Sequence, residues 1–199
     1  MRRLRGLSLW ILVLALAPRL EGIGQRLNAP GSIGAAAASS LPDGDRDERR
    51  PPKPGEKGPP PTASLLSEIE SLEQQCLEQL DVQRKARGLS RLAHSEDLLQ
   101  VARAYSRRMA EEKFFSHVDP DGHTIQQRVR EARIRWTALG ENLALSTGYI
   151  NPVAAAFSGW MASAGHRRNI LAPDYQRTAV GAWISSNGTV YLTEIFLKE

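Results

Sequence analysis

The sequence predicts an α+β sandwich, in which helices pack around a small, mainly antiparallel sheet. Two observations carry this prediction. Apolar residues recur with helical spacing in the middle of the chain, for example at positions 65, 69, 72, 76 and 80. Near the C-terminal end, "TAVGAWISS" and "TVYLTEIFL" alternate around Asn187-Gly188, which is the strongest short-range signal for a β-hairpin.

The chain divides into three segments of different composition. Residues 1–17 place three arginines before an apolar run, as in a secretory signal peptide, with an uncleaved N-terminal anchor as the alternative. Residues 18–63 hold nine of the twelve prolines and predict a disordered linker rich in proline, glycine and charge. Residues 64–199 are then expected to form one domain of ordinary size.

The charge distribution argues against a nucleic-acid partner. The formal net charge of the chain is +4, but residues 64–199 carry 16 basic and 16 acidic side chains. Nucleic-acid binders concentrate positive charge on the folded domain. Two arginine clusters are expected to be solvated helix faces, with an anionic-surface role as the alternative. They comprise Arg103, Arg107 and Arg108, and Arg128, Arg130, Arg133 and Arg135.

Capping residues delimit the first two helices. The first is expected from a cap at Ser64 to about Arg87, with Gly88 ending it in a left-handed turn. The second is expected from a cap at Ser95 to about Glu112. Cys76, the only cysteine, lies on the apolar stripe of the first helix, so core packing is its expected role and no intrachain disulfide can form.

The remaining elements follow in order. A turn, "VDPDGH", comes after the aromatic pair Phe114-Phe115, and a short helix is expected over 125–132. Another helix is expected over 152–162, with Pro152 in the permitted first turn. The hairpin around Asn187-Gly188 completes the domain.

Three polar residues stand beside turn-like or glycine-bearing segments flanked by apolar residues: His117, Glu141 and His166. Two histidines and one carboxylate are enough for a catalytic zinc site whose fourth ligand is water. The spacings of 24 and 25 residues match no local metal motif. Residue chemistry alone therefore leaves two interpretations open: one shared site, or three separately satisfied structural residues.

Five short motifs occur in order along the domain: "FFSHVDPDG" (114–122), "GENLA" (140–144), "WMASAGHRRNIL" (160–171), "VGAW" (180–183) and "YLTEIF" (191–196). Their order and spacing resemble the CAP superfamily, or SCP domain, which includes cysteine-rich secretory proteins, insect-venom antigen five and plant pathogenesis-related proteins. The resemblance covers about residues 65–197 and is strongest to the disulfide-free bacterial branch.

The resemblance implies an α-β-α sandwich with a central cleft where two histidines and two acidic residues converge. By position, His117 and His166 correspond to the two histidines and Glu141 to the first acid. Ser163 stands where many eukaryotic members have the second glutamate, which should weaken the affinity for a divalent cation. Ser163 and Gly165 would make a turn that points His166 into the cleft.

Four further residues receive structural interpretations. His123 is expected to be a solvated turn residue, with auxiliary cleft ligand as the alternative, and His94 a structural loop residue. Asn142 is expected to hold the "GEN" turn through its side chain. Glu194 alternates with its neighbours on the last strand, and is expected on the exposed side of the sheet, with the cleft rim as the alternative.

Three functions follow as hypotheses. The first is a secreted binding module whose cleft of His117, Glu141, Ser163 and His166 holds a lipid, peptide or cell-wall component. The second is a metal-dependent, protease-like hydrolase in which His117, His166 and Glu141 hold zinc or copper. The third is a metal-free mechanism with Ser163 as nucleophile beside His166 and Glu141.

The expected location is extracellular or in the cell envelope, with membrane contact only through an uncleaved N-terminal segment. Glu141 and Ser163 are the candidate catalytic residues. The sequence leaves the oligomeric state open.

Overall fold

The computed structural model describes residues 61–199, so the predicted signal peptide and nearly all of the predicted linker lie outside the described residues. The elements, in chain order, are α1 (Ala63–Lys85), β1 (Ala93–His94), α2 (Glu96–Glu112), α3 (Ile125–Glu131), β2 (Ala138–Ser146), α4 (Pro152–Ala162), α5 (Ala164–Leu171), β3 (Arg177–Ile184) and β4 (Val190–Lys198). Within this part of the chain, no helix combines the length and apolar character needed to cross a membrane.

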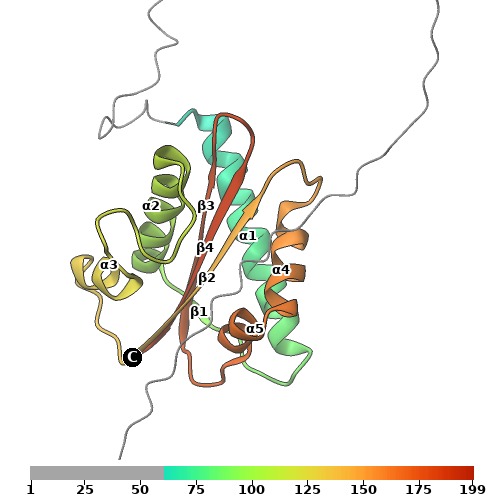
Figure 1. The fold of residues 1–199 in the computed structure, drawn as a ribbon. Helices are drawn as coiled ribbons and strands as arrows, with labels where there is room; N and C mark the ends of the chain where they lie inside the picture. The colour runs from blue at the N-terminus through green and yellow to red at the C-terminus, as the bar shows by residue number, and fades with distance from the viewer. Residues whose placement is uncertain (1–60) are drawn as a thin grey trace, which may run out of the picture. The chain divides into compact units, whose positions relative to one another are not determined.

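The strands form one sheet in the order β1-β3-β4-β2. β1 runs parallel to β3, while β4 pairs antiparallel with both β3 and β2. α2 and α3 cover one face, and α1, α4 and α5 cover the other (Figure 1). The predicted α+β class and its mainly antiparallel sheet flanked by helices are confirmed.

Most predicted helix ends agree with the structure, and one cap is wrong. The hydroxyl of Thr62, not Ser64, accepts the Leu65 backbone N–H at 3.2 Å. Thr62 has the extended backbone that an N-cap requires, which places Ser64 inside the first turn. The α2 cap is Ser95 as predicted, and Gly88 takes a left-handed conformation with φ of 70°.

Two segments expected as loops or turns are strands. His94 lies in β1, opposite Thr178 of β3. "GENLA" lies in the middle of β2, where Glu141 pairs with Ile195 and Asn142 with Glu194. The period-2 signal is missing because helices cover both faces of β2, so apolar and polar residues of this strand are buried alike.

α2 packs directly on β3 because of a glycine. A Cβ on Gly181 would lie 2.0 Å from the backbone nitrogen of Arg103 in α2, so only glycine allows this approach. Arg103 donates two hydrogen bonds to the buried carboxylate of Glu73, which also accepts the Ala182 N–H. Arg103 therefore joins α1, α2 and β3, and its expected place on a solvated helix face is wrong.

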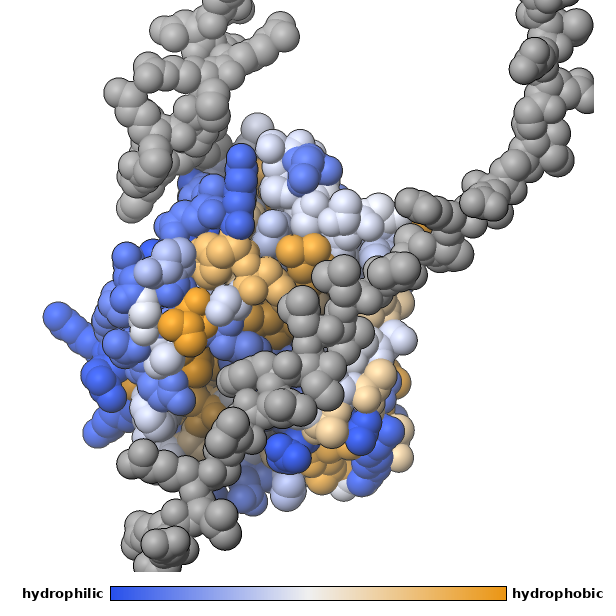
Figure 2. Space-filling view, viewed as in Figure 1, coloured by the Kyte–Doolittle hydropathy of each residue, from blue (hydrophilic) through white to orange (hydrophobic). Residues whose placement is uncertain are grey.

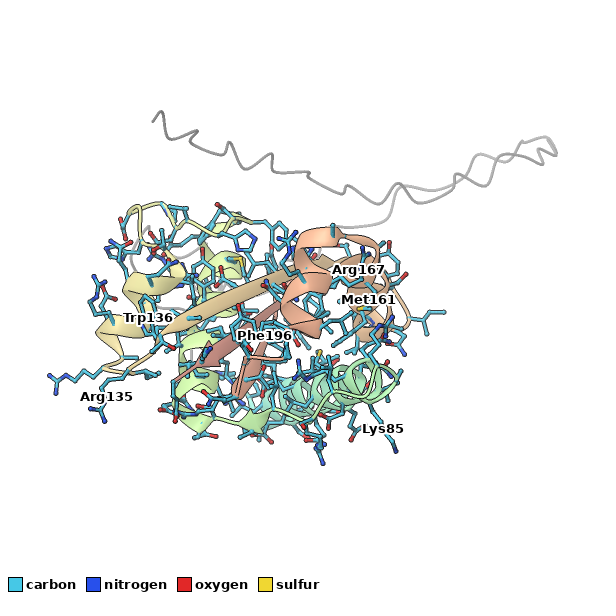
Figure 3. The ribbon with its side chains drawn as sticks, turned by 90° about the horizontal axis from the view of Figure 1, so that it is seen from below. Lys85, Arg135, Trp136, Met161, Arg167 and Phe196 are labelled. Carbon is cyan, nitrogen blue, oxygen red and sulfur yellow. The ribbon has the colours of Figure 1, made fainter. Side chains whose placement is uncertain are left out.

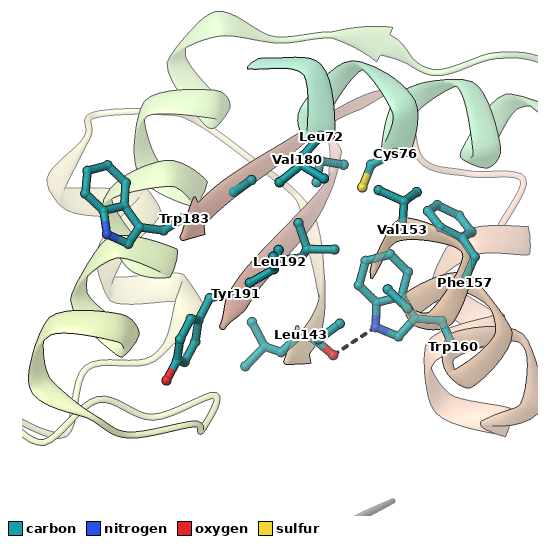
Figure 4. Close-up of a cluster of buried hydrophobic side chains, with 14 of the residues drawn as sticks. Leu72, Cys76, Leu143, Val153, Phe157, Trp160, Val180, Trp183, Tyr191 and Leu192 are labelled. Carbon is teal, nitrogen blue, oxygen red and sulfur yellow. Dashed lines mark hydrogen bonds between the residues drawn. The ribbon is translucent and has the colours of Figure 1, made fainter. Parts of the chain in front are cut away.

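The larger apolar core lies mainly between the sheet and α1, α4 and α5, and it continues to Tyr105, Met109 and Ala110 of α2 (Figure 4). Trp160 of α4 is 2% exposed, and its indole N–H donates to the Leu143 carbonyl of β2 at 2.8 Å. Cys76 of α1 is fully buried in the same cluster, as expected. A buried indole normally requires such a partner, so this bond fixes α4 against the strand that carries Glu141.

Two helices end in left-handed residues that are not glycine, Lys113 and Arg133, both with φ of 58°. After α3, the Arg133 N–H donates to the Arg130 carbonyl and the Ile134 N–H to the Val129 carbonyl. This is the Schellman arrangement, in which glycine is the usual left-handed residue.

Candidate functional site

Glu141 is held between a histidine and an arginine that come from different segments. Its Oε1 lies 2.8 Å from His117 Nδ1, and its Oε2 accepts from Arg128 Nη2 at 2.5 Å. The Glu141 side chain is only 3% exposed. β2 supplies Glu141, the loop after α2 supplies His117, and α3 supplies Arg128. Both carboxylate oxygens are thus engaged within the protein.

Arg128 organises this side of the site. Its guanidinium carbon lies 3.4 Å from the centroid of the Tyr105 ring. Its Nη1 donates to the carbonyls of His123, at 3.1 Å, and His117, at 3.4 Å. The Arg128 side chain is 10% exposed, so its expected place on a solvated helix face is wrong. Arg128 is buried because it pairs with the buried carboxylate of Glu141, and an ionised group away from water requires an oppositely charged partner.

Tyr105 of α2 fixes the loop that carries His117. Its hydroxyl donates to the Ser116 carbonyl at 2.6 Å, and its ring makes an edge contact with Phe114. Burial of the ring raises the pKa of Tyr105 to about 12, and the nearby Arg128 opposes that rise. The hydroxyl therefore stays protonated as a donor to the loop at neutral pH.

His166 approaches from the other side of β2. It lies in the first turn of α5, so the expected turn at Ser163 and Gly165 is instead the junction where α4 ends and α5 begins. The ring centroids of His166 and His117 are 6.5 Å apart. Because β2 is an edge strand, a residue from each face of the sheet can meet beside it.

The His166 ring is half-buried, and among residues 61–199 it has no hydrogen-bond partner. Burial, followed by the proximity of His117, lowers the pKa of His166. The imidazole is therefore neutral at pH 7, with one ring nitrogen as a donor and the other as an acceptor.

A buried network of polar side chains connects α5 to the sheet. Asn142 donates from Nδ2 to the His166 carbonyl at 3.3 Å and to Glu194 Oε2 at 3.0 Å. Its Oδ1 accepts from Asn169 of α5 at 2.9 Å. A Cβ on Gly140 would lie 2.5 Å from the Tyr175 hydroxyl and 3.0 Å from Asn169 Oδ1, so a larger residue here would displace these two polar side chains. Asn142 thus joins β2 to the helix that carries His166.

The expected exposure of Glu194 is wrong. The side chain is completely buried, because α1, α4 and α5 cover the face of β4 on which it lies. Burial raises the pKa of Glu194 to about 8, while the bond from Asn142 and the charge of Arg84 act in the opposite direction. Its Oε1 has no hydrogen-bond partner. Glu194 is neutral at pH 7 and lies beneath the site.

Ser163 marks the corner between α4 and α5. Its backbone N–H donates to the Gly159 and Trp160 carbonyls, and its hydroxyl makes no capping bond to α5. Within residues 61–199, the Ser163 hydroxyl forms no hydrogen bond with His166 or Glu141. The proximity that a nucleophile and its base require is therefore not realised in this conformation.

The predicted metal ligands differ in how they are engaged. Among residues 61–199, no group of three or more His, Cys, Asp or Glu side chains is arranged to hold a metal ion. Glu141 is engaged by His117 and Arg128, so the set of His117, His166 and Glu141 does not fit three direct ligands in this arrangement. Direct coordination by all three stays a prediction.

His123 lies to one side of the site. Its ring is 37% exposed, with Nδ1 3.6 Å from Asp119 Oδ2. The Asp119 carboxylate is buried and pairs with Arg108 of α2, and it accepts the backbone N–H groups of Asp121 and His123. The partly solvated turn position agrees with the expectation for His123.

Sequence reasoning missed Arg128 and Asn169 as residues of the site. Arg128 lies in a run of arginines that resembles an exposed helix face, and its partner is 13 residues away on a strand. Asn169 bonds to Asn142 across 27 residues. No local pattern marks either contact. The signal that was available is Asn142 itself, because its buried amide requires several partners.

Comparison with known proteins identifies the domain. Residues 77–196 match the family model described as "CAP: Cysteine-rich secretory protein family". Two Bacillus subtilis proteins are each 32% identical to this chain. The uncharacterized protein YkwD matches over 69% of the chain and 51% of its own length, and the uncharacterized membrane protein YlbC over 63% and 34%. The chain thus spans a third to a half of these relatives.

Solved structures share the fold. An extracellular SCP-domain protein from Bacillus anthracis superposes with a TM-score of 0.60 at 24% identity, covering 72% of this chain and 45% of that one. An outer surface protein from Borrelia burgdorferi gives 0.58 at 18% identity, covering 63% and 91%. With the helix-sheet-helix layers and the ordered motifs around His117, Glu141 and His166, the family match shows that this chain belongs to the CAP, or cysteine-rich secretory protein, family.

Proposed function

We propose that this protein is an exported ligand-binding module whose cleft lies between His117 and His166. The observation that carries the proposal is the state of Glu141, whose two carboxylate oxygens are already bound by His117 and Arg128. A carboxylate in that state positions a histidine rather than removing a proton from a substrate. The binding chemistry would then reside in the imidazoles.

The two histidines suit a ligand that combines polar and apolar parts. His166 offers a neutral ring with a donor and an acceptor, set 6.5 Å from the His117 ring. Beside His117 in the sequence, Phe115 is 39% exposed and Val118 46% exposed. Binding sites commonly combine an apolar lining with a few polar groups that orient the ligand. A lipid, a peptide or a cell-wall fragment has this composition.

The test is retention of defined probes by the full chain, measured by native mass spectrometry. The probes are muropeptides from digested peptidoglycan, oleate, and a tripeptide mixture. We expect one probe class to be retained, and His166→Ala to weaken its retention about tenfold, the loss expected for one hydrogen-bonding group. His123→Ala is the matched control, because it removes a histidine outside the cleft. Retention of none of the three would reject the proposal.

A metal-dependent hydrolase is the second candidate, and the contact between His117 and Glu141 favours it. A metal-bound histidine commonly donates its other ring N–H to a carboxylate. Glu141 holds Nδ1 of His117, so a cation would be bound through Nε2, together with His166. Zinc or copper would supply Lewis acidity to a bound water, and Glu141 would orient the ligand instead of binding the metal.

Titration calorimetry with Zn²⁺ and with Cu²⁺ at pH 7.5 tests this candidate. One-to-one binding that is lost in both His117→Ala and His166→Ala would support it, with Glu141→Gln weakening the affinity about tenfold, as expected for an outer partner. Absence of stoichiometric binding in the unaltered chain would remove the hydrolase and leave the binding module.

Export is supported by the sequence and by the described relatives. Residues 1–17 have the pattern of a signal peptide, and the similar Bacillus anthracis protein is described as extracellular, whereas YlbC is described as a membrane protein. N-terminal mass determination after expression in a bacterial host separates the alternatives. A cut after the apolar run supports export with release, and an intact N-terminus in the membrane fraction supports the anchor.

A further inference from the structure

A basic hollow of about 790 Å³ lies at the end of the sheet where α3 runs into β2. Its walls include Arg130, Arg133 and Arg135, the tryptophan Trp136, and Arg177 at the start of β3. None of the cleft residues His117, Glu141 and His166 lines it, so it is separate from the site proposed above. Figure 2 shows hydrophilic surface gathered on the flank of the molecule that α2 and α3 form.

The positive charge in this hollow is only partly compensated. Arg177 pairs with Asp97 at 2.7 Å and with Glu199 at 3.2 Å. Among residues 61–199, by contrast, Arg130, Arg133 and Arg135 form no ion pair. Three guanidinium groups around one concavity repel each other unless an anion joins them. The acids in the hollow, Asp97 and Glu199, pair with Arg177, so an anion that enters would meet three exposed guanidinium groups that have no carboxylate partner in the described residues.

The turn after α3 sets the position of Arg133 in the hollow. Arg133 occupies the left-handed position of the turn after α3, where φ is 58° and glycine is the usual residue. A long side chain in this conformation carries a backbone cost, which Lys113 after α2 shares. The turn places Arg133 on the wall of the hollow, between Arg130 at the end of α3 and Arg135 on the way to β2.

The residue types indicate the ligand. The planar guanidinium fork matches the oxygens of a phosphate in pairs. Trp136 is partly exposed on the same wall and presents a flat apolar surface, against which the C–H face of a sugar ring can pack. The concave shape and its volume accommodate a discrete group better than a planar bilayer. We propose that this hollow binds a phosphate-bearing carbohydrate through Arg130, Arg133 and Arg135, with Trp136 contacting the sugar.

Two glycine substitutions give the sharpest test. Arg133→Gly removes the guanidinium and the backbone cost together, so the variant should melt at or above the temperature of the unaltered chain. It should bind glucose 1,6-bisphosphate about tenfold more weakly in calorimetry, the loss expected for one charge-assisted contact. Lys113→Gly is the matched control, because it also relieves a left-handed residue and removes one positive charge. It should bind the bisphosphate as the unaltered chain does.

A triple substitution tests the charge. Arg130→Gln, Arg133→Gln and Arg135→Gln together should abolish binding of the bisphosphate. The control triple of Lys85→Gln, Arg87→Gln and Arg91→Gln removes equal charge elsewhere. Lys85 and Arg135 project from opposite ends of the molecule (Figure 3), so the control triple should leave binding intact. Equal loss in both triples would mean that net charge alone attracts the ligand, and would overturn the proposal.

Further binding measurements distinguish a sugar phosphate from inorganic phosphate and from a lipid headgroup. Trp136→Ala should weaken the binding of the bisphosphate more than the binding of pyrophosphate. Unphosphorylated glucose should not bind to the unaltered chain. Equal affinities for pyrophosphate and the bisphosphate would overturn the carbohydrate assignment. Binding to phosphatidylglycerol vesicles without binding of any soluble phosphate would overturn the proposal in favour of a membrane surface. Because the His117 and His166 variants should bind the bisphosphate normally, failure here and failure of the proposed cleft are distinguishable.

Discussion

The buried carboxyl of Glu194 should make the stability of this protein fall as the pH rises. Its folded-state pKa is raised by burial to about 8, from an ordinary value of 4.5. Between pH 4.5 and about 8, the carboxyl is therefore mainly neutral in the folded chain and mainly ionised in the unfolded chain. Its contribution to stability is fully present below pH 4.5 and is lost as the pH rises toward 8, because the unfolded chain releases the proton first.

The size of the effect follows from the two pKa values. Each pH unit between them lowers the free energy of unfolding by about 1.4 kcal/mol. Between pH 4.5 and pH 7 the loss is roughly 3 kcal/mol, which is a large fraction of the stability of an ordinary domain. Two buried groups near this carboxyl, Cys76 and Arg84, also have shifted pKa values. Burial and the charges of Glu194 and Glu73 raise the pKa of Cys76, while burial lowers the pKa of Arg84.

Glu194→Gln isolates this contribution, because it keeps the volume and the contact with Asn142 but cannot ionise. Urea unfolding at pH 5, 6 and 7 gives the free energy for both chains. The difference between them should change by about 1.4 kcal/mol per pH unit in favour of the variant. Glu68→Gln, an exposed change on α1, should show no such slope. A constant difference for Glu194→Gln across this range would refute the reasoning.

Three further outcomes follow from the geometry. NMR titration of the His166 ring should give a midpoint below 6.5, since burial lowers its pKa, and His117→Ala should raise that midpoint only part of the way. Arg128→Met should lower the urea-derived free energy of unfolding by about 3 kcal/mol, because it leaves a buried carboxylate without its charge partner. Gly181→Ala should cost about 3 kcal/mol by forcing α2 off the sheet, whereas Gly159→Ala, with open space around it in α4, should stabilise the protein by about 0.5 kcal/mol.

The sequence was sufficient where local rules decide the structure. The cap at Ser95 and the hairpin around Asn187-Gly188 follow from local chemistry, and both agree with the structure. β2 escaped prediction because both of its faces are covered and its alternation is lost. Glu194 was misplaced for a related reason. Alternation along a strand says which residues share a face, but not that helices cover both faces.

The sequence predicts the two histidines of the site, but not the residues that position them. The motifs single out His117, Glu141 and His166, and the structure brings the first two into contact and the third to 6.5 Å from His117. Arg128 depends on a contact across 13 residues and on the desolvation of Glu141. Such long-range pairing is set by packing of α3 against the sheet, and no spacing rule encodes it.

The central claim is that His117 and His166, from opposite sides of the edge strand β2, form one binding cleft. A double-mutant cycle measures this directly, with dissociation constants for the retained probe in the unaltered chain, His117→Ala, His166→Ala and the double variant. We expect the double variant to bind less than about twofold more weakly than either single one, a coupling of about 1 kcal/mol or more. Unchanged affinity in either single variant would contradict the claim, because a histidine that lines the cleft must contribute to binding of the probe.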